Sequence, residues 1–342
     1  MYHRRPQSPS DLKKQRLQEE YDEVEEEGAL GHFMVFGQRH EHLWFGDGTI
    51  VLRADDTRYR VHADILETCS SEFKRMLETE TKDEGSLVVG VPLLVLDDEP
   101  IYVECMLNFF YKISEVEEYE TGASPSYLYL KAWLHMGQKY AIKTLWMAAV
   151  DHIVRVYPPG LSDFEMRYEY TCTEEGEEYG LDALDAYLVA DLALSYDLHS
   201  VLPIALFCIC DEPPDELFKV RTIVKDSVLG QEMYDKTEAE IMKRCYIGRG
   251  RLRALQHMEL MTTLYAPVSD ACTQKEKCKE ITKSLYEETQ EKNWFSDADR
   301  GHMWMRNSIS ASVCPNCRDF YEQQDKESRA KHWSKLGTMF TP

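Results

Sequence analysis

The hydrophobic pattern changes its period between residues 45 and 77, and this change predicts a β-hairpin followed by a helix. Residues 49–52 are β-branched and apolar, and residues 57–61 alternate with period two. Turn-forming residues lie before and between these runs, at 46–48 and 54–56, as in a tightly turned antiparallel pair. Apolar side chains then recur at spacings of three and four, as one buried helix face requires. They are Ile65, Leu66, Cys69, Phe73, Met76 and Leu77.

A second group of elements follows a polar loop. Residues 93–96 form a short apolar run that predicts a buried strand. A helix is expected next, with Asp97 or Asp98 as its N-cap. Two more helices are expected over residues 126–140 and 142–156, and Pro158 and Pro159 end the second because proline cannot continue a helix.

The remainder of the chain is predicted to be mainly helical. Residues 181–210 form a strongly helical stretch, and residues 215–340 alternate short amphipathic helices with polar loops. The segment Gly248-Arg249-Gly250-Arg251 lacks the lysine and the preceding strand of a phosphate-binding loop. We therefore expect a turn between helices there, with its basic residues facing solvent.

Polar and acidic stretches suggest the domain boundaries. Residues 1–41 offer no periodic apolar face and are expected to be mostly disordered. Residues 42–157 form the first domain, residues 158–180 an acidic linker, and residues 181–342 a helical C-terminal region with a candidate zinc site.

Composition narrows the classes of function. The chain has 342 residues and a net charge of −22, which disfavours nucleic acid and anionic lipid as partners and favours basic proteins. It contains no run of eighteen apolar residues, so no membrane span is expected. The N-terminus has no apolar stretch of the kind that directs secretion, so we expect an intracellular protein of the cytoplasm or nucleus. Its ten cysteines are then thiols or metal ligands rather than disulfides.

The order of the first elements resembles the opening of a BTB/POZ domain. The resemblance rests on the two strands, on His62-x-x-Ile65-Leu66 and on Ser70-x-x-Phe73, and it continues through the strand at 93–96 and the later helices. It covers about residues 42–157. The implied fold class is α+β, a BTB/POZ fold with a small β-sheet flanked by helices, followed by a mainly α-helical region.

Three C-terminal segments resemble the corresponding region of a large fungal group of BTB-containing proteins. These segments are residues 181–210, 241–252 and 312–340. This second resemblance carries little functional information of its own.

The BTB resemblance implies a scaffold that dimerises through its N-terminal segment and first helices. The dimer face would contain Phe33, Met34, Val35, Phe36, Leu43 and Trp44. Such domains also bind cullin-3 as substrate adaptors of ubiquitin ligases, or recruit corepressors, and helices in 181–210 could support cullin binding. The alternative function is a transcriptional or chromatin cofactor with a structural zinc site. We expect no enzyme, because no nucleophile–base pair or cofactor loop stands out.

The sharpest chemical signal is Cys314-x-x-Cys317, because a tight turn can bring two thiolates at this spacing to one metal ion. Cys272 and Cys278, five residues apart, could complete a four-ligand structural zinc site. Two alternatives stay open from the sequence. The four residues are either zinc ligands or buried thiols, and His302 or His332 could replace one of them. Cys208-x-Cys210 is interpreted as a pair of buried thiols.

Overall fold

A computed structural model describes residues 37–80, 87–88, 90–112, 127–171, 183–211, 219, 237–264, 268–291 and 313–341. The chain divides into two compact units. Unit 1 contains Met1–Pro125 and Tyr129–Ala148, and unit 2 contains Ser126–Leu128 and Ala149–Pro342. The domain boundaries expected from the sequence stay predictions.

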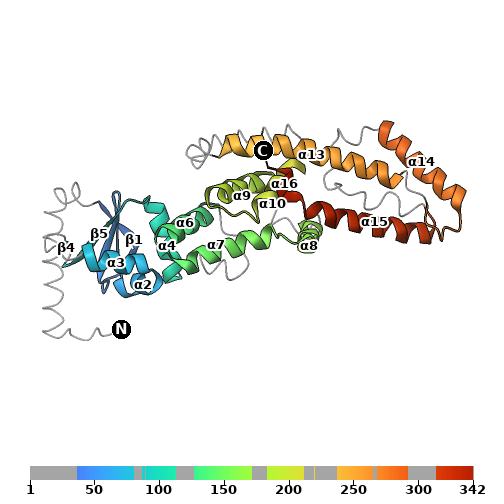
Figure 1. Cartoon of the computed structure of the whole chain (residues 1–342). Helices are drawn as coiled ribbons and strands as arrows, with labels where there is room; N and C mark the ends of the chain where they lie inside the picture. The colour runs from blue at the N-terminus through green and yellow to red at the C-terminus, as the bar shows by residue number, and fades with distance from the viewer. Residues whose placement is uncertain are drawn as a thin grey trace, which may run out of the picture. The chain divides into compact units, whose positions relative to one another are not determined.

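Unit 1 is built on a β-sheet (Figure 1). The sheet has five strands in the order β1-β3-β2-β5-β4. Its central strand β2 pairs antiparallel with β3 and parallel with β5. The predicted hairpin is confirmed, with Ile50 opposite Val61 and Ala54 opposite Thr57. Asp55 takes the left-handed conformation that its tight turn needs (φ 48°), which aspartate tolerates well. The strands are β1 (Gln38–Trp44), β2 (Ile50–Ala54), β3 (Thr57–Val61), β4 (Leu87–Val88) and β5 (Val91–Leu96).

Strand β1 begins inside the segment that we expected to be mostly disordered, so that expectation is wrong for residues 38–41. The backbone N–H of Gln38 donates to the carbonyl of Asp56 at 2.5 Å, and β1 runs parallel to β3. Most side chains of β1 are exposed, so its sequence has no alternating apolar pattern that would predict a strand. Residues 1–36, including Phe33–Phe36 of the expected dimer face, lie outside the described residues.

Two residues of the expected dimer face are described. Leu43 is fully buried in unit 1 and belongs to its core, so its assignment to an exposed dimer face is wrong. Trp44 is half-buried, and the guanidinium of Arg39 lies over its ring at 4.7 Å.

The helices that the apolar pattern predicted for this part of the chain are present. Phe73 and Leu66 are buried on the stripe expected from the sequence. Helix α4 has Pro100 at its first position, but its N-cap is Glu99, and neither Asp97 nor Asp98 caps it. The helices are α2 (Ala63–Cys69), α3 (Ser71–Glu80), α4 (Pro100–Tyr111), α6 (Tyr127–Lys139) and α7 (Lys143–Val156); the last two contribute residues to both units.

Unit 2 is helical in the part of it that the structure describes (Figure 1). The stretch predicted at 181–210 consists of two helices, because the chain turns at Asp197 with a positive φ of 56°. Part of the predicted acidic linker is a helix, since Phe164 packs its ring against Phe207 and Trp333. The helices are α8 (Leu161–Thr171), α9 (Ala183–Ser195), α10 (Leu202–Asp211), α13 (Glu238–Leu264), α14 (Lys275–Glu291), α15 (Pro315–Trp333) and α16 (Leu336–Met339).

The predicted turn at Gly248–Arg251 is wrong, because these residues lie in the middle of α13. The ring of Phe340 occupies the space that a Cβ at Gly248 would need. Arg251 donates from one guanidinium nitrogen to the carbonyls of Thr338, Met339 and Thr341 at 2.7–3.1 Å. The segment is therefore helical and packs against residues 338–341 instead of forming a loop.

Candidate metal centre

The four predicted cysteines come together in unit 2, at the N-terminal ends of α14 and α15. Cys272 precedes α14, which begins at Lys275, and Cys278 is the fourth residue of that helix. Cys314 is the N-cap of α15, and Cys317 lies in the first turn of that helix. Each helix thus supplies one sulfur ahead of its start and one sulfur from its beginning. The positive end of each helix dipole favours thiolates at these positions.

Local sequence explains both turns. Pro315 occupies the first position of α15, where a missing N–H costs nothing, so the helix begins directly after Cys314. The N–H of Cys317 then donates to the carbonyl of Cys314 at 3.0 Å. On the other side, the N–H of Cys272 donates to the carbonyl of Ser269 at 2.8 Å. Turns of this kind bring the paired sulfurs to one side.

Two contacts join the segment around Cys272 and Cys278 to the segment around Cys314 and Cys317. The side-chain amide of Asn316 donates to the carbonyl of Ala271 at 2.6 Å. The backbone N–H of Cys314 points at the sulfur of Cys278 at 3.4 Å. The site is therefore formed by segments far apart in the sequence.

The spacing of the sulfurs fits a single tetrahedral ion. All four sulfur atoms lie within 4.8 Å of one another, and those of Cys272 and Cys314 are 3.7 Å apart. Zinc–sulfur bonds of about 2.3 Å place the sulfurs of a tetrahedral site about 3.8 Å apart. A disulfide would bring two sulfurs to about 2.05 Å, and all four residues are free cysteines. The cluster could hold a metal ion.

Proton affinities differ within the cluster. Backbone N–H groups, that of Cys317 first, lower the pKa of Cys314 to about 6. Burial raises the pKa of Cys317 to about 12, and it also raises the pKa of Cys278. Four thiolates this close repel one another strongly, so full deprotonation needs a cation among them.

The cluster also forms the core of this part of unit 2. Cys278 and Cys317 are fully buried, and the apolar members beside the cysteines are few. Those apolar and aromatic neighbours are Val268, Val313 and Tyr321, with Ile281 and Phe320 partly buried around them. A core this small stabilises its surroundings weakly, so a bound ion would supply the cohesion that apolar burial does not.

The alternative histidine ligands do not join the cluster where they are described. His332 lies on α15 beyond Cys317, about 22 Å along the helix axis at 1.5 Å per residue. Its Nδ1 lies 3.2 Å from the hydroxyl of Ser328. His302 lies outside the described residues. Cys208 and Cys210 are buried in α10, as expected.

Sequence reasoning did not single out Tyr321, which lies one turn after Cys317. Its side chain is buried in the cluster, and its hydroxyl has no hydrogen-bond partner among the described residues. Burial and the neighbouring cysteines raise its pKa to about 12, so it stays a neutral phenol. The only sequence signal that could have indicated Tyr321 is its position four residues after Cys317, which places it on the same face of the helix.

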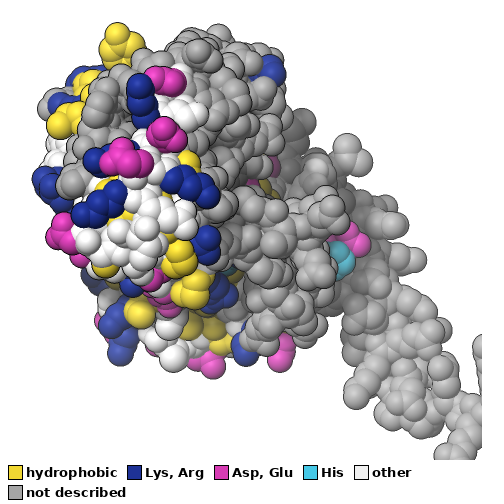
Figure 2. All heavy atoms as spheres, turned by 90° about the vertical axis from the view of Figure 1, so that its right-hand side faces the viewer, with side chains coloured by type: hydrophobic (Ala, Val, Ile, Leu, Met, Phe, Trp, Pro, Cys, Tyr) yellow, Lys and Arg dark blue, Asp and Glu magenta, His cyan; other side chains and the backbone are white. Residues whose placement is uncertain are grey.

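The surface of this end of the molecule carries both charges (Figure 2). Basic, acidic and hydrophobic side chains are interspersed on the described part of this face. Two lysines of α14 pair with glutamates one turn away, Lys279 with Glu276 and Lys283 with Glu287, each at 3.8 Å. Mixed charge of this kind is typical of a solvated surface.

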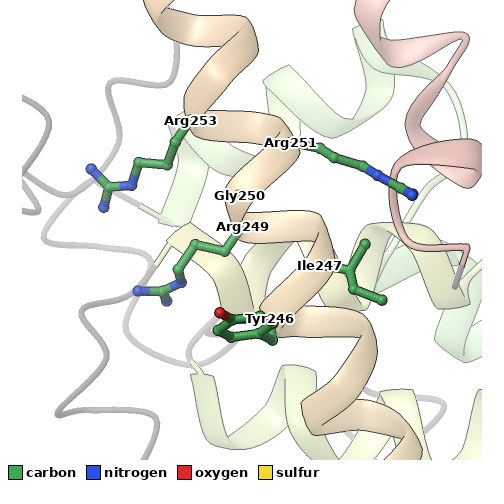
Figure 3. A pocket seen from close by; sticks show the side chains of 6 residues that line it. All are labelled: Tyr246, Ile247, Arg249, Gly250, Arg251 and Arg253. Atoms are coloured by element: carbon green, nitrogen blue, oxygen red, sulfur yellow. The ribbon is translucent and has the colours of Figure 1, made fainter.

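A shallow groove of about 570 Å³ lies along α13 (Figure 3). Its described lining residues all belong to this helix and are Tyr246, Ile247, Arg249, Gly250, Arg251 and Arg253. Tyr246 is 85% exposed, and the groove is open to solvent. Because the described lining comes from one helix, the groove is not the enclosed, largely apolar cavity that is typical of small-molecule sites.

No family model, no curated protein and no solved structure matches this chain. Across the residues that the structure describes, no helix combines the length and apolarity needed to cross a membrane.

Proposed function

We propose that the protein is a non-enzymatic interaction scaffold whose unit 1 is a BTB/POZ-type domain that self-associates. The observation that supports this most is the order of elements in unit 1. The β2–β3 hairpin is followed by α2 and α3, by strand β5, by α4, and by the pair α6 and α7. This is the order on which the resemblance of the sequence rests.

The sheet register supports the same proposal. After α2 and α3 the chain returns to the sheet as β5, which pairs parallel with β2. Strand β1 lies at one edge of the sheet, with β3 as its partner. Its side chains at Gln38 and Arg39 are exposed. An edge strand is a surface on which a second copy of the chain can pair.

We further propose that the cysteine cluster binds one structural zinc ion. Four thiolates without an open coordination position are typical of zinc sites that hold a fold together, whereas catalytic sites keep one position for water. The zinc would join the starts of α14 and α15 in the C-terminal region, which then presents a fixed surface to a partner.

Light scattering with metal analysis on the full chain tests both parts. We expect a dimer at micromolar concentration and one zinc per chain. Replacing Cys314 and Cys317 by serine should abolish zinc binding and leave the dimer intact, because the two features lie in different units. Cys69→Ser is the matched control, since it removes a half-buried thiol of unit 1. A strictly monomeric chain would contradict the scaffold proposal.

A narrower form of the proposal makes the protein a cullin-3 adaptor. The full chain should then retain purified cullin-3 on a column at micromolar concentration. Absence of retention would remove this form and leave self-association as the proposed activity.

A further inference from the structure

The two most exposed residues of the cluster, Cys272 and Cys314, precede different helices. Cys272 and Cys314 are 8% and 5% exposed, whereas Cys278 and Cys317 are 0% exposed. The outer pair is also in direct contact, with 3.7 Å between the sulfurs. A small oxidant therefore reaches this pair before it reaches the inner one.

We propose, on the basis of the zinc site proposed above, that Cys272 and Cys314 form a reversible redox switch. A peroxide would join them in a disulfide, and the metal ion would leave. The sulfurs need to approach from 3.7 Å to about 2.05 Å, and both residues lie outside the helix interiors.

The chemistry balances with one peroxide molecule. One thiolate attacks the O–O bond of hydrogen peroxide and becomes a sulfenic acid, and a hydroxide ion leaves. The neighbouring thiolate attacks the sulfenic sulfur, the S–S bond forms, and a second hydroxide ion leaves. Two thiolates lose two electrons in total, and the peroxide is reduced to two hydroxide ions.

Loss of the outer pair removes half of the donors. Cys278 and Cys317 alone leave a two-ligand site, and a closed zinc site needs four. The new disulfide also ties the start of α14 to the start of α15. The two turns therefore stay together after the ion leaves, so reduction restores the site without a search through the unfolded chain.

The test uses the full chain loaded with zinc. Its metal content is measured first, and hydrogen peroxide is then added with a colorimetric zinc indicator. Free thiols are blocked with iodoacetamide, and the non-reduced protein is digested with trypsin. Cleavage after Lys275 and Lys277 separates Cys272 from Cys278, and tandem mass spectrometry distinguishes Cys314 from Cys317.

We expect one zinc released per chain, a Cys272–Cys314 disulfide, alkylated Cys278 and Cys317, and recovery of zinc after dithiothreitol and added zinc. The Cys69→Ser variant should behave identically. A zinc-loaded chain that forms a Cys314–Cys317 disulfide, or that keeps its zinc in peroxide, overturns the switch alone. A chain that contains no zinc before peroxide overturns the zinc site as well, so the two failures are distinguishable.

Discussion

At the scale of single residues, two glycines of α13 have opposite roles. A Cβ added at Gly248 would overlap the ring of Phe340, which is 1% exposed. A Cβ added at Gly250 would meet nothing within 4 Å. Gly248 is therefore required by packing, whereas Gly250 leaves its helix less stable than an alanine would.

This difference gives a matched pair of variants. Gly248→Ala should destabilise unit 2 by about 1–3 kcal/mol, because the ring of Phe340 must move. Gly250→Ala should stabilise it by about 0.5–1 kcal/mol, because glycine is a poor helix former. Urea unfolding of the two variants measures both effects. Equal midpoints for the variants would contradict the close approach of Phe340.

The glycines also show why this part was mispredicted. Two glycines among arginines look like a break between helices, because local propensity alone disfavours glycine in a helix. The reason for Gly248 is Phe340, which lies far along the chain, and no local pattern indicates that contact. The Cys314-x-x-Cys317 signal was predictable because its meaning depends on local spacing alone.

At the scale of elements, the start of α3 depends on one hydroxyl. Ser70 and Ser71 stand next to each other before this helix, and serine is a favourable N-cap residue at either position. In the structure, the hydroxyl of Ser70 accepts the N–H of Phe73 at 2.9 Å and donates to the carbonyl of Tyr140 at 2.5 Å. Ser71 is exposed. Ser70 therefore caps the helix and also ties it to the end of α6.

Ser70→Ala should cost about 1–2 kcal/mol of unfolding free energy, because it removes the cap and leaves a buried carbonyl without its donor. Ser71→Ala should change stability by about 0.5 kcal/mol or less, as exposed substitutions do. Denaturant unfolding compares the two. Similar losses in both variants would show that Ser70 is not the cap.

A buried carboxylate joins the loop before α4 to α6. Asp98 accepts hydrogen bonds from His135 at 3.1 Å, from Lys139 at 2.8 Å and from the hydroxyl of Tyr140. Burial alone would raise the pKa of Asp98, but these donors outweigh it and hold the pKa at about 2. This engagement explains why Asp98 does not cap α4, although its position before Pro100 suggested it.

Asp98 should make unit 1 sensitive to acid. Its folded pKa lies below the unfolded value of about 3.9, so its contribution is complete above that pH and is lost as the pH falls toward 2. Asp98→Asn should cost on the order of 2 kcal/mol at pH 7, and the difference from the unsubstituted protein should shrink between pH 4 and 2. Urea midpoints across this range measure it. Asp97→Asn is the control, because the Asp97 side chain is 88% exposed. If the difference in urea midpoint between Asp98→Asn and the unsubstituted protein stays constant across this pH range, Asp98 is not the group that makes unit 1 sensitive to acid.

At the scale of the whole molecule, the sheet of unit 1 and the region around the cysteine cluster of unit 2 rest on different kinds of core. Unit 1 buries large apolar side chains such as Ile50, Leu52 and Phe73 around its sheet. The hairpin and the helices of that unit were predictable because their periods are local. The partner of β1 was not, because a parallel pairing with a distant strand depends on the complete fold. The four cysteines of unit 2 were grouped correctly from their spacing, whereas Tyr321 and the other residues packed around them depend on the fold.

Metal removal should therefore loosen one region and spare the other. With a strong zinc chelator, we expect faster amide hydrogen exchange at the starts of α14 and α15, because the small core around Cys278 and Cys317 loses its central ion. Exchange in β2, β3 and β5 should stay unchanged, because their core contains no cysteine of the cluster. Hydrogen exchange measured by mass spectrometry with and without chelator tests this expectation.

Added zinc should restore protection in the unsubstituted protein and not in the variant with Cys314→Ser and Cys317→Ser. Loss of protection across both units would mean that the cluster supports the whole chain, and no change anywhere would contradict a structural role for the ion.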